Sequence, residues 1–236
     1  DNKVSYNLPA AFIDTFEGDD GILTETNVDR DVTGEYVNSQ VLTGDSNSNM
    51  IINFDTDATT LLAGTGDYTV TTANNGVRVT ADKKYGAGSF HVPGGSDRIE
   101  IEPLTGALFD DVTGSDDWTM EFWHKNSGGG TGTYRSIMNK SDNFGSGAFD
   151  QRLYYHSNNT LYYDINCSGG AVNMNLGTGW GGVAQQWHHW ALTRQGNTIR
   201  IYQNGTQLGS VACSGTLNNT AGSKIAFGGA YVGNGN

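Results

Sequence analysis

The sequence has 236 residues, and its 13 Lys and Arg against 25 Asp and Glu give a formal charge of −12. An acidic chain offers no cationic face to phosphates, so this charge argues against binding to nucleic acid or to an anionic membrane surface. No apolar run approaches the ~18 residues of a membrane-spanning helix, so we expect no membrane insertion. The 5 Trp, 11 Tyr and 9 Phe argue against wholesale disorder.

Apolar and polar residues alternate with a period of two along most of the chain, and helical periodicity is almost absent. The predicted strands, in chain order, are Met50–Phe54, Tyr68–Thr71, Val77–Thr80, Ser89–Val92, Arg98–Ile101, Trp118–Trp123, Arg135–Asn139, Arg152–His156, Leu161–Ile165, Val172–Leu176, Trp187–Arg194, Thr198–Gln203, Gln207–Ala212 and Lys224–Phe227. Between two of them, Asn204-Gly205 supplies the two positive φ angles of a type I′ hairpin. Many short strands at this spacing predict an all-β sandwich.

Residues 1–47 differ from the rest, because they carry many acids and only a few apolar clusters. We expect them to form an N-terminal arm or the edge of a preceding module, packed on something else such as another subunit. The sandwich domain is expected over residues 48–236. The chain starts at Asp1 and stops in the turn-like Gly233-Asn234-Gly235-Asn236, so we expect it to be a piece of something longer.

The order of motifs in the predicted sandwich is specific. It runs through Met50-Ile51-Ile52-Asn53-Phe54-Asp55, Tyr85-Gly86-Ala87-Gly88-Ser89-Phe90, Asp97-Arg98-Ile99-Glu100-Ile101, Asp117-Trp118-Thr119-Met120-Glu121-Phe122-Trp123 and Gln186-Trp187-His188-His189-Trp190, and then to the Asn204-Gly205 hairpin. Over roughly residues 50–229 this order resembles the laminin-G-like domains of the concanavalin A-like lectin/glucanase superfamily, which is related to pentraxins. It is most similar to the versions found in phage and bacterial surface proteins. The resemblance implies an antiparallel jelly-roll β-sandwich, but a fold does not fix a ligand.

The end of the sandwich departs from the family pattern. Family members continue, after a strand like Lys224–Phe227, through a Gly/Asn loop into a final strand that closes a sheet. Here residues 230–236 end within that loop. We therefore expect that the closing strand is missing from the sequence or that another chain supplies it, since an unpaired sheet position is adhesive.

No catalytic group is predicted. Retaining glycosidases need two carboxyls about 5–5.5 Å apart, placed in this fold as Glu-x-Asp-x-x-Glu on one strand. Glu100-Ile101-Glu102 and the segment from Asp116 to Glu121 lack those acids at that spacing. His188 and His189 are strand neighbours that point to opposite faces, so they cannot converge on one ion, and we expect structural roles for them.

Calcium is the one ion that the sequence suggests, and it is not required. In the pentraxin branch, half of the calcium site precedes a strand as Asp-Asn, and Asp150-Gln151 stands at the similar place. The other half is an acidic loop after the strand that resembles Lys224–Phe227. Residues 228–233 contain no carboxylate, so only Asp150 carries over as a candidate metal ligand.

Glycan binding needs aromatic platforms together with polar side chains that meet hydroxyls. Trp180, between glycines, is the best candidate, and Tyr231, Asp150 and Gln151 are the other residues to which we assign carbohydrate binding. Tyr134 and Phe144 are further aromatic candidates outside the core strands. Cys167 and Cys213 are equally compatible with a disulfide and with two free thiols.

These observations predict a non-catalytic, lectin-like recognition or adhesion module. We expect it on the virion surface or otherwise outside the cell, as a phage capsid decoration or tail-fibre component that binds host-surface glycans and contacts neighbouring subunits. A purely structural coat protein and an accessory domain of a secreted glycoside hydrolase are the alternatives. A structural coat protein predicts no affinity for glycans. If the chain were itself an enzyme, which we call the enzyme alternative, its turnover would depend on Glu100, Glu102 or Glu121.

Overall fold

The computed structural model describes residues 29–30, 36–37, 50–52, 54, 61–64, 68–73, 75–95, 97–103, 117–126, 134–142, 144, 149–178, 185–218, 220 and 222–229. Every regular element in these ranges is a β-strand. None of them forms a helix long and apolar enough to cross a membrane. The chain divides into two compact units, Asp1–Val41 and Leu42–Asn236. In the first unit, β1 (Asp29–Arg30) pairs with β2 (Tyr36–Val37) in an antiparallel ladder.

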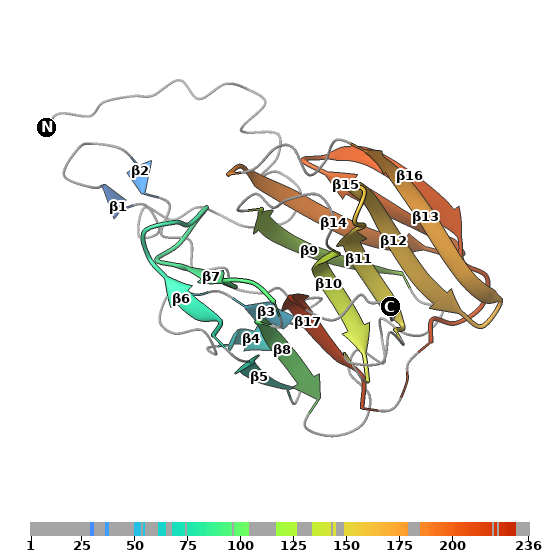
Figure 1. Cartoon of the computed structure of the whole chain (residues 1–236), viewed down its shortest axis with the longest axis horizontal. Coiled ribbons are helices and arrows are strands. Elements are labelled where there is room, and N and C mark those ends of the chain that lie inside the picture. Colours follow the sequence, from blue (N-terminus) through green and yellow to red (C-terminus); the bar gives the residue numbers. More distant parts are fainter. Residues whose placement is uncertain are drawn as a thin grey trace, which may run out of the picture. The chain divides into compact units, whose positions relative to one another are not determined.

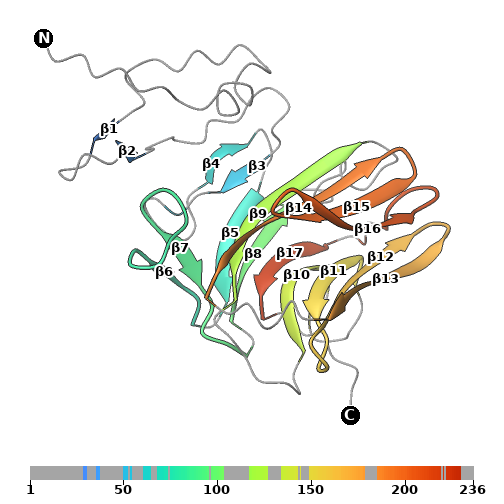
Figure 2. The same cartoon turned by 90° about the horizontal axis from the view of Figure 1, so that it is seen from above.

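A seven-stranded antiparallel sheet forms one layer of the second unit. Its strands follow the order β13-β12-β11-β10-β17-β8-β5, which is visible in Figure 2. They are β5 (Tyr68–Ala73), β8 (Arg98–Pro103), β10 (Arg135–Ser141), β11 (Gln151–Tyr155), β12 (Thr160–Cys167), β13 (Gly170–Thr178) and β17 (Lys224–Gly228). The last strand of the described residues, β17, therefore lies inside this sheet, between β10 and β8. The prediction of a missing closing strand concerns residues 230–236, which lie outside the described residues.

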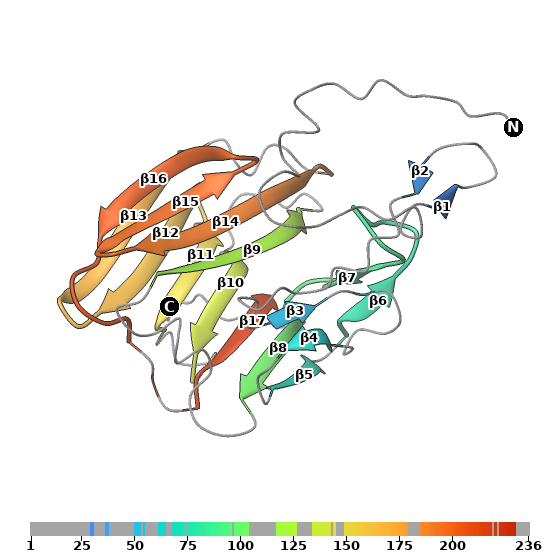
Figure 3. The ribbon, with the colours of Figure 1, turned by 180° about the vertical axis from the view of Figure 1, so that it is seen from behind.

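A four-stranded antiparallel sheet forms the other layer, in the order β16-β15-β14-β9, as Figure 3 shows from the far side. Its strands are β9 (Trp118–Lys125), β14 (Trp187–Gln195), β15 (Thr198–Gln203) and β16 (Thr206–Ala212). Two small hairpins accompany the sheets: β3 (Met50–Ile52) with β4 (Leu61–Gly64), and β6 (Val77–Val79) with β7 (Ser89–His91).

The two sheets form facing layers (Figure 1), and buried apolar side chains of both form a hydrophobic core. Every second residue of a strand faces it, because successive side chains of a strand point to opposite faces. Leu161, Tyr163 and Ile165 enter the core from β12, and Trp190 and Leu192 enter it from β14; all five are fully buried. The predicted jelly-roll β-sandwich is thereby confirmed.

Two further contacts hold the layers together at the edge where β13 faces β16. A disulfide joins Cys167, the last residue of β12, to Cys213, which directly follows β16. Of the two states that the sequence left open for these cysteines, the structure has the bridge. On β16, a Cβ atom at Gly209 would lie 2.6 Å from the Sδ atom of Met174. A larger residue at this position would require the end of the Met174 side chain to shift, so β13 and β16 pack closely here.

Each strand predicted from Met50 onward is present, with ends that differ by a few residues. The hairpin turn has φ angles of 49° at Asn204 and 78° at Gly205, which confirms the predicted type I′ geometry. The prediction missed β4, because Leu61-Leu62-Ala63-Gly64 shows no alternation.

Candidate functional site

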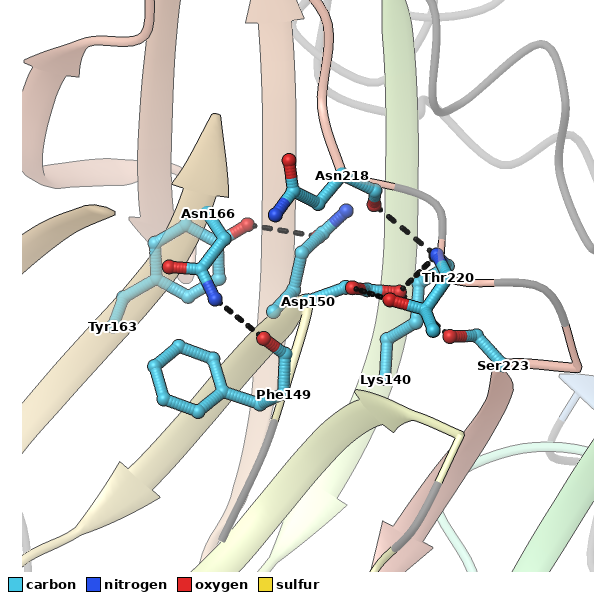
Figure 4. Close-up of polar contacts among 9 residues, drawn as sticks. Lys140, Phe149, Asp150, Tyr163, Asn166, Asn218, Thr220 and Ser223 are labelled. Atoms are coloured by element: carbon cyan, nitrogen blue, oxygen red, sulfur yellow. Dashed lines mark hydrogen bonds and ion pairs between the residues drawn. The ribbon is translucent and has the colours of Figure 1, made fainter. Parts of the chain in front are cut away.

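The predicted calcium ligand, Asp150, lies directly before β11 and is 3% exposed. Its carboxylate accepts hydrogen bonds from Lys140 Nζ at 2.9 Å, from Ser223 Oγ at 2.6 Å and from the hydroxyl of Thr220 at 2.8 Å. The backbone N–H of Thr220 donates to the same carboxylate at 3.1 Å. Figure 4 shows these donors around Asp150. Asp150 thus connects β10, the start of β11 and the segment that leads into β17.

The environment of Asp150 keeps its carboxyl group ionised. Burial raises the pKa of Asp150, but hydrogen bonds from Ser223, Lys140 and Thr220 and the charge of Lys140 outweigh burial and lower the pKa below its ordinary value. Lys140, 1% exposed, supplies the balancing positive charge. Within the described part of the chain, no three His, Cys, Asp or Glu side chains gather to hold a metal ion. Calcium at Asp150 stays a prediction, and the ion would have to displace the Lys140 ammonium.

Gln151 is 1% exposed and faces the interior of the protein. Its Oε1 atom accepts a hydrogen bond from the hydroxyl of Tyr163 at 3.0 Å. Sugar binding by Asp150 and Gln151 stays a prediction, but both side chains are buried, so the geometry favours internal structural roles. Trp180 and Tyr231, the two aromatic residues predicted to bind carbohydrate, lie outside the described residues.

Two of the three carboxylates considered for an enzyme form ion pairs with one lysine. Glu100 and Glu102 of β8 both contact the ammonium of Lys224 on the neighbouring strand β17. Burial raises the pKa of Glu100, but Arg98 and Lys224 lower it overall. The general acid of a glycosidase needs a raised pKa, so Glu100 is poorly suited to that role. Glu121 lies on β9 in the other sheet.

The two adjacent histidines of β14 occupy opposite faces, as the strand period predicts. His188 stands opposite His124 on β9, on the face that carries Trp190 and Leu192 into the core. Burial, with further contributions from the charges of His188 and Arg135, lowers the pKa of His124 to about 4. His189 stands on the outer face.

Exposed aromatic side chains gather on the outer face of the four-stranded sheet. Trp123 of β9 is 38% exposed, and Tyr85, from the segment between β6 and β7, is 59% exposed. Their rings meet edge to face with centroids 5.4 Å apart, and the ring of His189 lies 5.1 Å from that of Trp123. The Nζ atom of Lys84 lies 4.8 Å from the Trp123 centroid. We call Lys84, Tyr85, Trp123 and His189 the aromatic platform.

Polar groups border the aromatic platform. Glu121, with a side chain that is 57% exposed, has its carboxylate 3.8 Å from His189 Nε2. Lys125 pairs with Asp82 at 2.6 Å. This surface therefore places hydrogen-bond donors and acceptors beside exposed aromatic side chains.

The sequence prediction missed the platform, because Trp123 was assigned to an obvious core strand. The period of β9 contains the signal that was overlooked. Trp118, Met120 and Phe122 share the face that packs on the core, which places Trp123 with Glu121 on the outer face. Tyr85 lies in the irregular segment between β6 and β7, where no periodicity indicates its exposure.

A second aromatic group lies on the outer face of the seven-stranded sheet, and its members bond mainly to one another. The predicted candidate Tyr134 has its hydroxyl 2.6 Å from His156 Nε2. Tyr154 stacks with Tyr162 at 5.7 Å and is only 5% exposed. The other candidate, Phe144, lies 5.2 Å from the guanidinium of Arg98. These contacts leave less free ring surface than the aromatic platform has.

Three solved structures illustrate the likeness of the chain to known folds. The binding domain of botulinum neurotoxin serotype D is 14% identical, with a TM-score of 0.48 over 72% of this chain and 39% of that one. Domain 4 of AbnA, an extracellular GH43 arabinanase from Geobacillus stearothermophilus in complex with arabinotriose, is 14% identical, with a TM-score of 0.44 over 68% and 72%. Bacillus licheniformis β-glucanase is 14% identical, with a TM-score of 0.40 over 73% and 88%. The chain thus spans about two fifths of the toxin domain.

The family assignment rests on the sequence. Comparison with curated proteins finds no match. Residues 93–236, more than half of the chain, match a laminin G family model described as the concanavalin A-like lectin/glucanases superfamily. This chain belongs to that superfamily.

Proposed function

We propose that this chain is a non-catalytic, lectin-like recognition module that binds glycans through the aromatic platform. The observation that carries the proposal is the exposure of two neighbouring aromatic rings, Trp123 at 38% and Tyr85 at 59%. Neighbouring aromatic side chains that remain exposed are a feature of binding surfaces. The apolar face of a sugar stacks on such rings, while Glu121 and His189 offer partners to its hydroxyls.

The ion pairs of the acidic residues support a binding role without catalysis. Lys224 contacts both Glu100 and Glu102, and the pKa of Glu100 lies below its ordinary value. A carboxyl group in this state does not protonate a leaving group near neutral pH.

We further propose that the module works outside the cell, displayed on a larger assembly such as a phage capsid or tail fibre, where it meets host-surface glycans and neighbouring subunits. The Cys167–Cys213 disulfide supports an oxidising environment. The formal charge of −12 favours contact with glycans or proteins over contact with nucleic acid.

A glycan-array screen of the folded protein, run with Ca²⁺ and with a chelator, tests the function. Trp123→Ala and Tyr85→Ala are expected to lose binding by on the order of tenfold or more, equivalent to about 1.4 kcal/mol. Val77→Ala is the matched control, because Val77 is 48% exposed and lies outside the platform. An unchanged Tm in each variant shows that the fold is intact.

The outcomes separate the alternatives. Binding lost in both platform variants and kept in Val77→Ala supports the proposal. Binding that survives in both platform variants overturns the assignment of the surface. A blank array with folded protein overturns glycan recognition and favours a structural coat protein. Hydrolysis of an array glycan that Glu100→Gln abolishes would instead support the enzyme alternative.

A further inference from the structure

The outer face of the four-stranded sheet carries a second feature, a shallow depression at the end away from the aromatic platform. We propose that platform and depression form one elongated binding face, and that its ligand is a linear oligosaccharide chain rather than a single sugar. This inference rests on the proposed function, and it specifies the length and the direction of the ligand.

Strand register places the two features on one line. The outward residues of β9 include Thr119, Glu121 and Trp123. Their direct partners on β14 are Thr193, Ala191 and His189, respectively. From Trp123 at the platform to Thr119 at the depression, β9 advances four residues, or about 14 Å at about 3.4 Å per residue. A ligand that touches both ends must therefore span about 14 Å.

The depression has the chemistry of a hydroxyl-binding site. Its polar lining includes Asp117, Thr119, Thr193, Gln195, Arg200 and Tyr202. Asp117 Oδ1 accepts a hydrogen bond of 2.6 Å from the backbone N–H of Gly196, which fixes the carboxylate in place. Hydroxyl, amide and guanidinium groups of this kind orient sugars through several hydrogen bonds at once.

Arg200 supplies the strongest donor group of the depression. Its Nη1 atom lies 3.4 Å from Gln195 Oε1, a long and weak hydrogen bond. Among the described residues, no carboxylate lies within ion-pair distance of this guanidinium. Arg200 can therefore donate to a ligand without breaking an internal ion pair.

Tyr202 and Ala191 connect the two ends of the face. Tyr202 of β15 stands directly opposite Ala191 of β14, and Arg200 stands opposite Thr193. Ala191 is 8% exposed, and Glu121 and Tyr202 stand beside it on the neighbouring strands. A chain that stacks on Trp123 can pass over Glu121 and Tyr202 and reach Arg200.

Calorimetric titration with cello-, laminari- and arabino-oligosaccharides, from monosaccharide to hexasaccharide, tests this inference. Affinity for the series that binds is expected to rise with chain length until the ligand spans the face. Arg200→Ala and Thr193→Ala are expected to lower the affinity for the hexasaccharide by on the order of tenfold and to leave the shortest ligands unaffected. Trp123→Ala weakens binding at every length. Thr71→Ala, an exposed strand residue on the other sheet, is the matched control for Thr193→Ala.

The failures of the two proposals are distinguishable. Equal affinity for short and long ligands, with binding still lost in Trp123→Ala, overturns the elongated face and leaves the platform standing. If affinity rises with ligand length but Arg200→Ala and Thr193→Ala leave the affinity for the hexasaccharide unchanged, the elongated face is also overturned and the platform is retained. Binding insensitive to Trp123→Ala overturns the assignment of the platform together with this inference. No binding to any of the three series overturns this inference, and a blank glycan array in addition overturns the proposed function.

Discussion

Lys140 and Asp150 form an ion pair of 2.9 Å inside the protein, with side chains that are 1% and 3% exposed. The lysine lies on β10 and the aspartate directly before β11, and Asp150 N–H also donates to the Lys140 carbonyl at 2.8 Å. Thr220 and Ser223 bind the same carboxylate from the segment before β17. The pair therefore holds three neighbouring strands of the large sheet in register.

Lys140→Met is expected to destabilise the protein by about 3–5 kcal/mol, because it leaves the Asp150 carboxylate buried without a balancing charge. Lys125→Met is the matched control. It breaks the pair with Asp82, whose side chain is 52% exposed, and should cost less than about 1 kcal/mol. Urea unfolding measures both values. Equal losses in the two variants would contradict the structural importance assigned to the buried pair.

The same ion pair predicts how the protein responds to calcium. Since four donors already surround the Asp150 carboxylate, we expect the same Tm with excess Ca²⁺ as with a chelator. Scanning calorimetry in the two buffers is the measurement. A rise in Tm with Ca²⁺ that disappears in Asp150→Asn would establish Asp150 as a calcium ligand after all.

The disulfide is expected to contribute substantially to stability. Cys167 and Cys213 are 46 residues apart, and closing a loop of that length stabilises the folded state by about 4 kcal/mol in the chain-entropy model. The Cys167→Ala/Cys213→Ala double variant should lose about 2–4 kcal/mol in urea unfolding. Adding a reductant should affect the wild-type protein and leave the double variant unchanged. A wild type that is insensitive to reductant would show that the bridge is not formed in solution.

The lowered pKa of His124 predicts that the protein loses stability in mild acid. Its pKa falls from 6.5 to about 4 on folding, so between these pH values the unfolded chain binds a proton that the folded protein does not. Stability is therefore complete above pH 6.5 and decreases toward pH 4, by up to about 3 kcal/mol. Asp150 and Glu100, whose pKa values are lowered, lose their contributions only at lower pH.

Unfolding free energies measured from pH 7 to pH 4 test this behaviour. His124→Asn should flatten the pH dependence in that range. His91→Asn, at an exposed position, should retain the wild-type dependence. Parallel curves for the wild type and His124→Asn would contradict the role assigned to burial of His124.

The alternation of side chains and the Asn204-Gly205 turn determine the fold class, because both act over a few neighbouring residues. Period-two patterns predicted the strands from Met50 onward, and the sequence also placed His188 and His189 on opposite faces. β4 was not predicted, because Leu61–Gly64 has no periodic pattern. Its pairing with β3 depends on tertiary contacts, which the local sequence does not indicate.

Contacts between residues far apart in the chain decide which face of a strand is exposed to solvent. They also decide which charged side chains form ion pairs. The sequence marks Asp150 as a carboxylate before a strand, but only the folding of β10 and β17 around it makes Lys140, Thr220 and Ser223 its partners. Likewise, the period of β9 separates Trp123 from Phe122, but only the packing of the two sheets decides that Phe122 meets the core and Trp123 remains exposed beside Tyr85. Local pattern thus determined the strands, whereas burial between two sheets, which is a property of the assembled layers, decided which side chains form the proposed binding face.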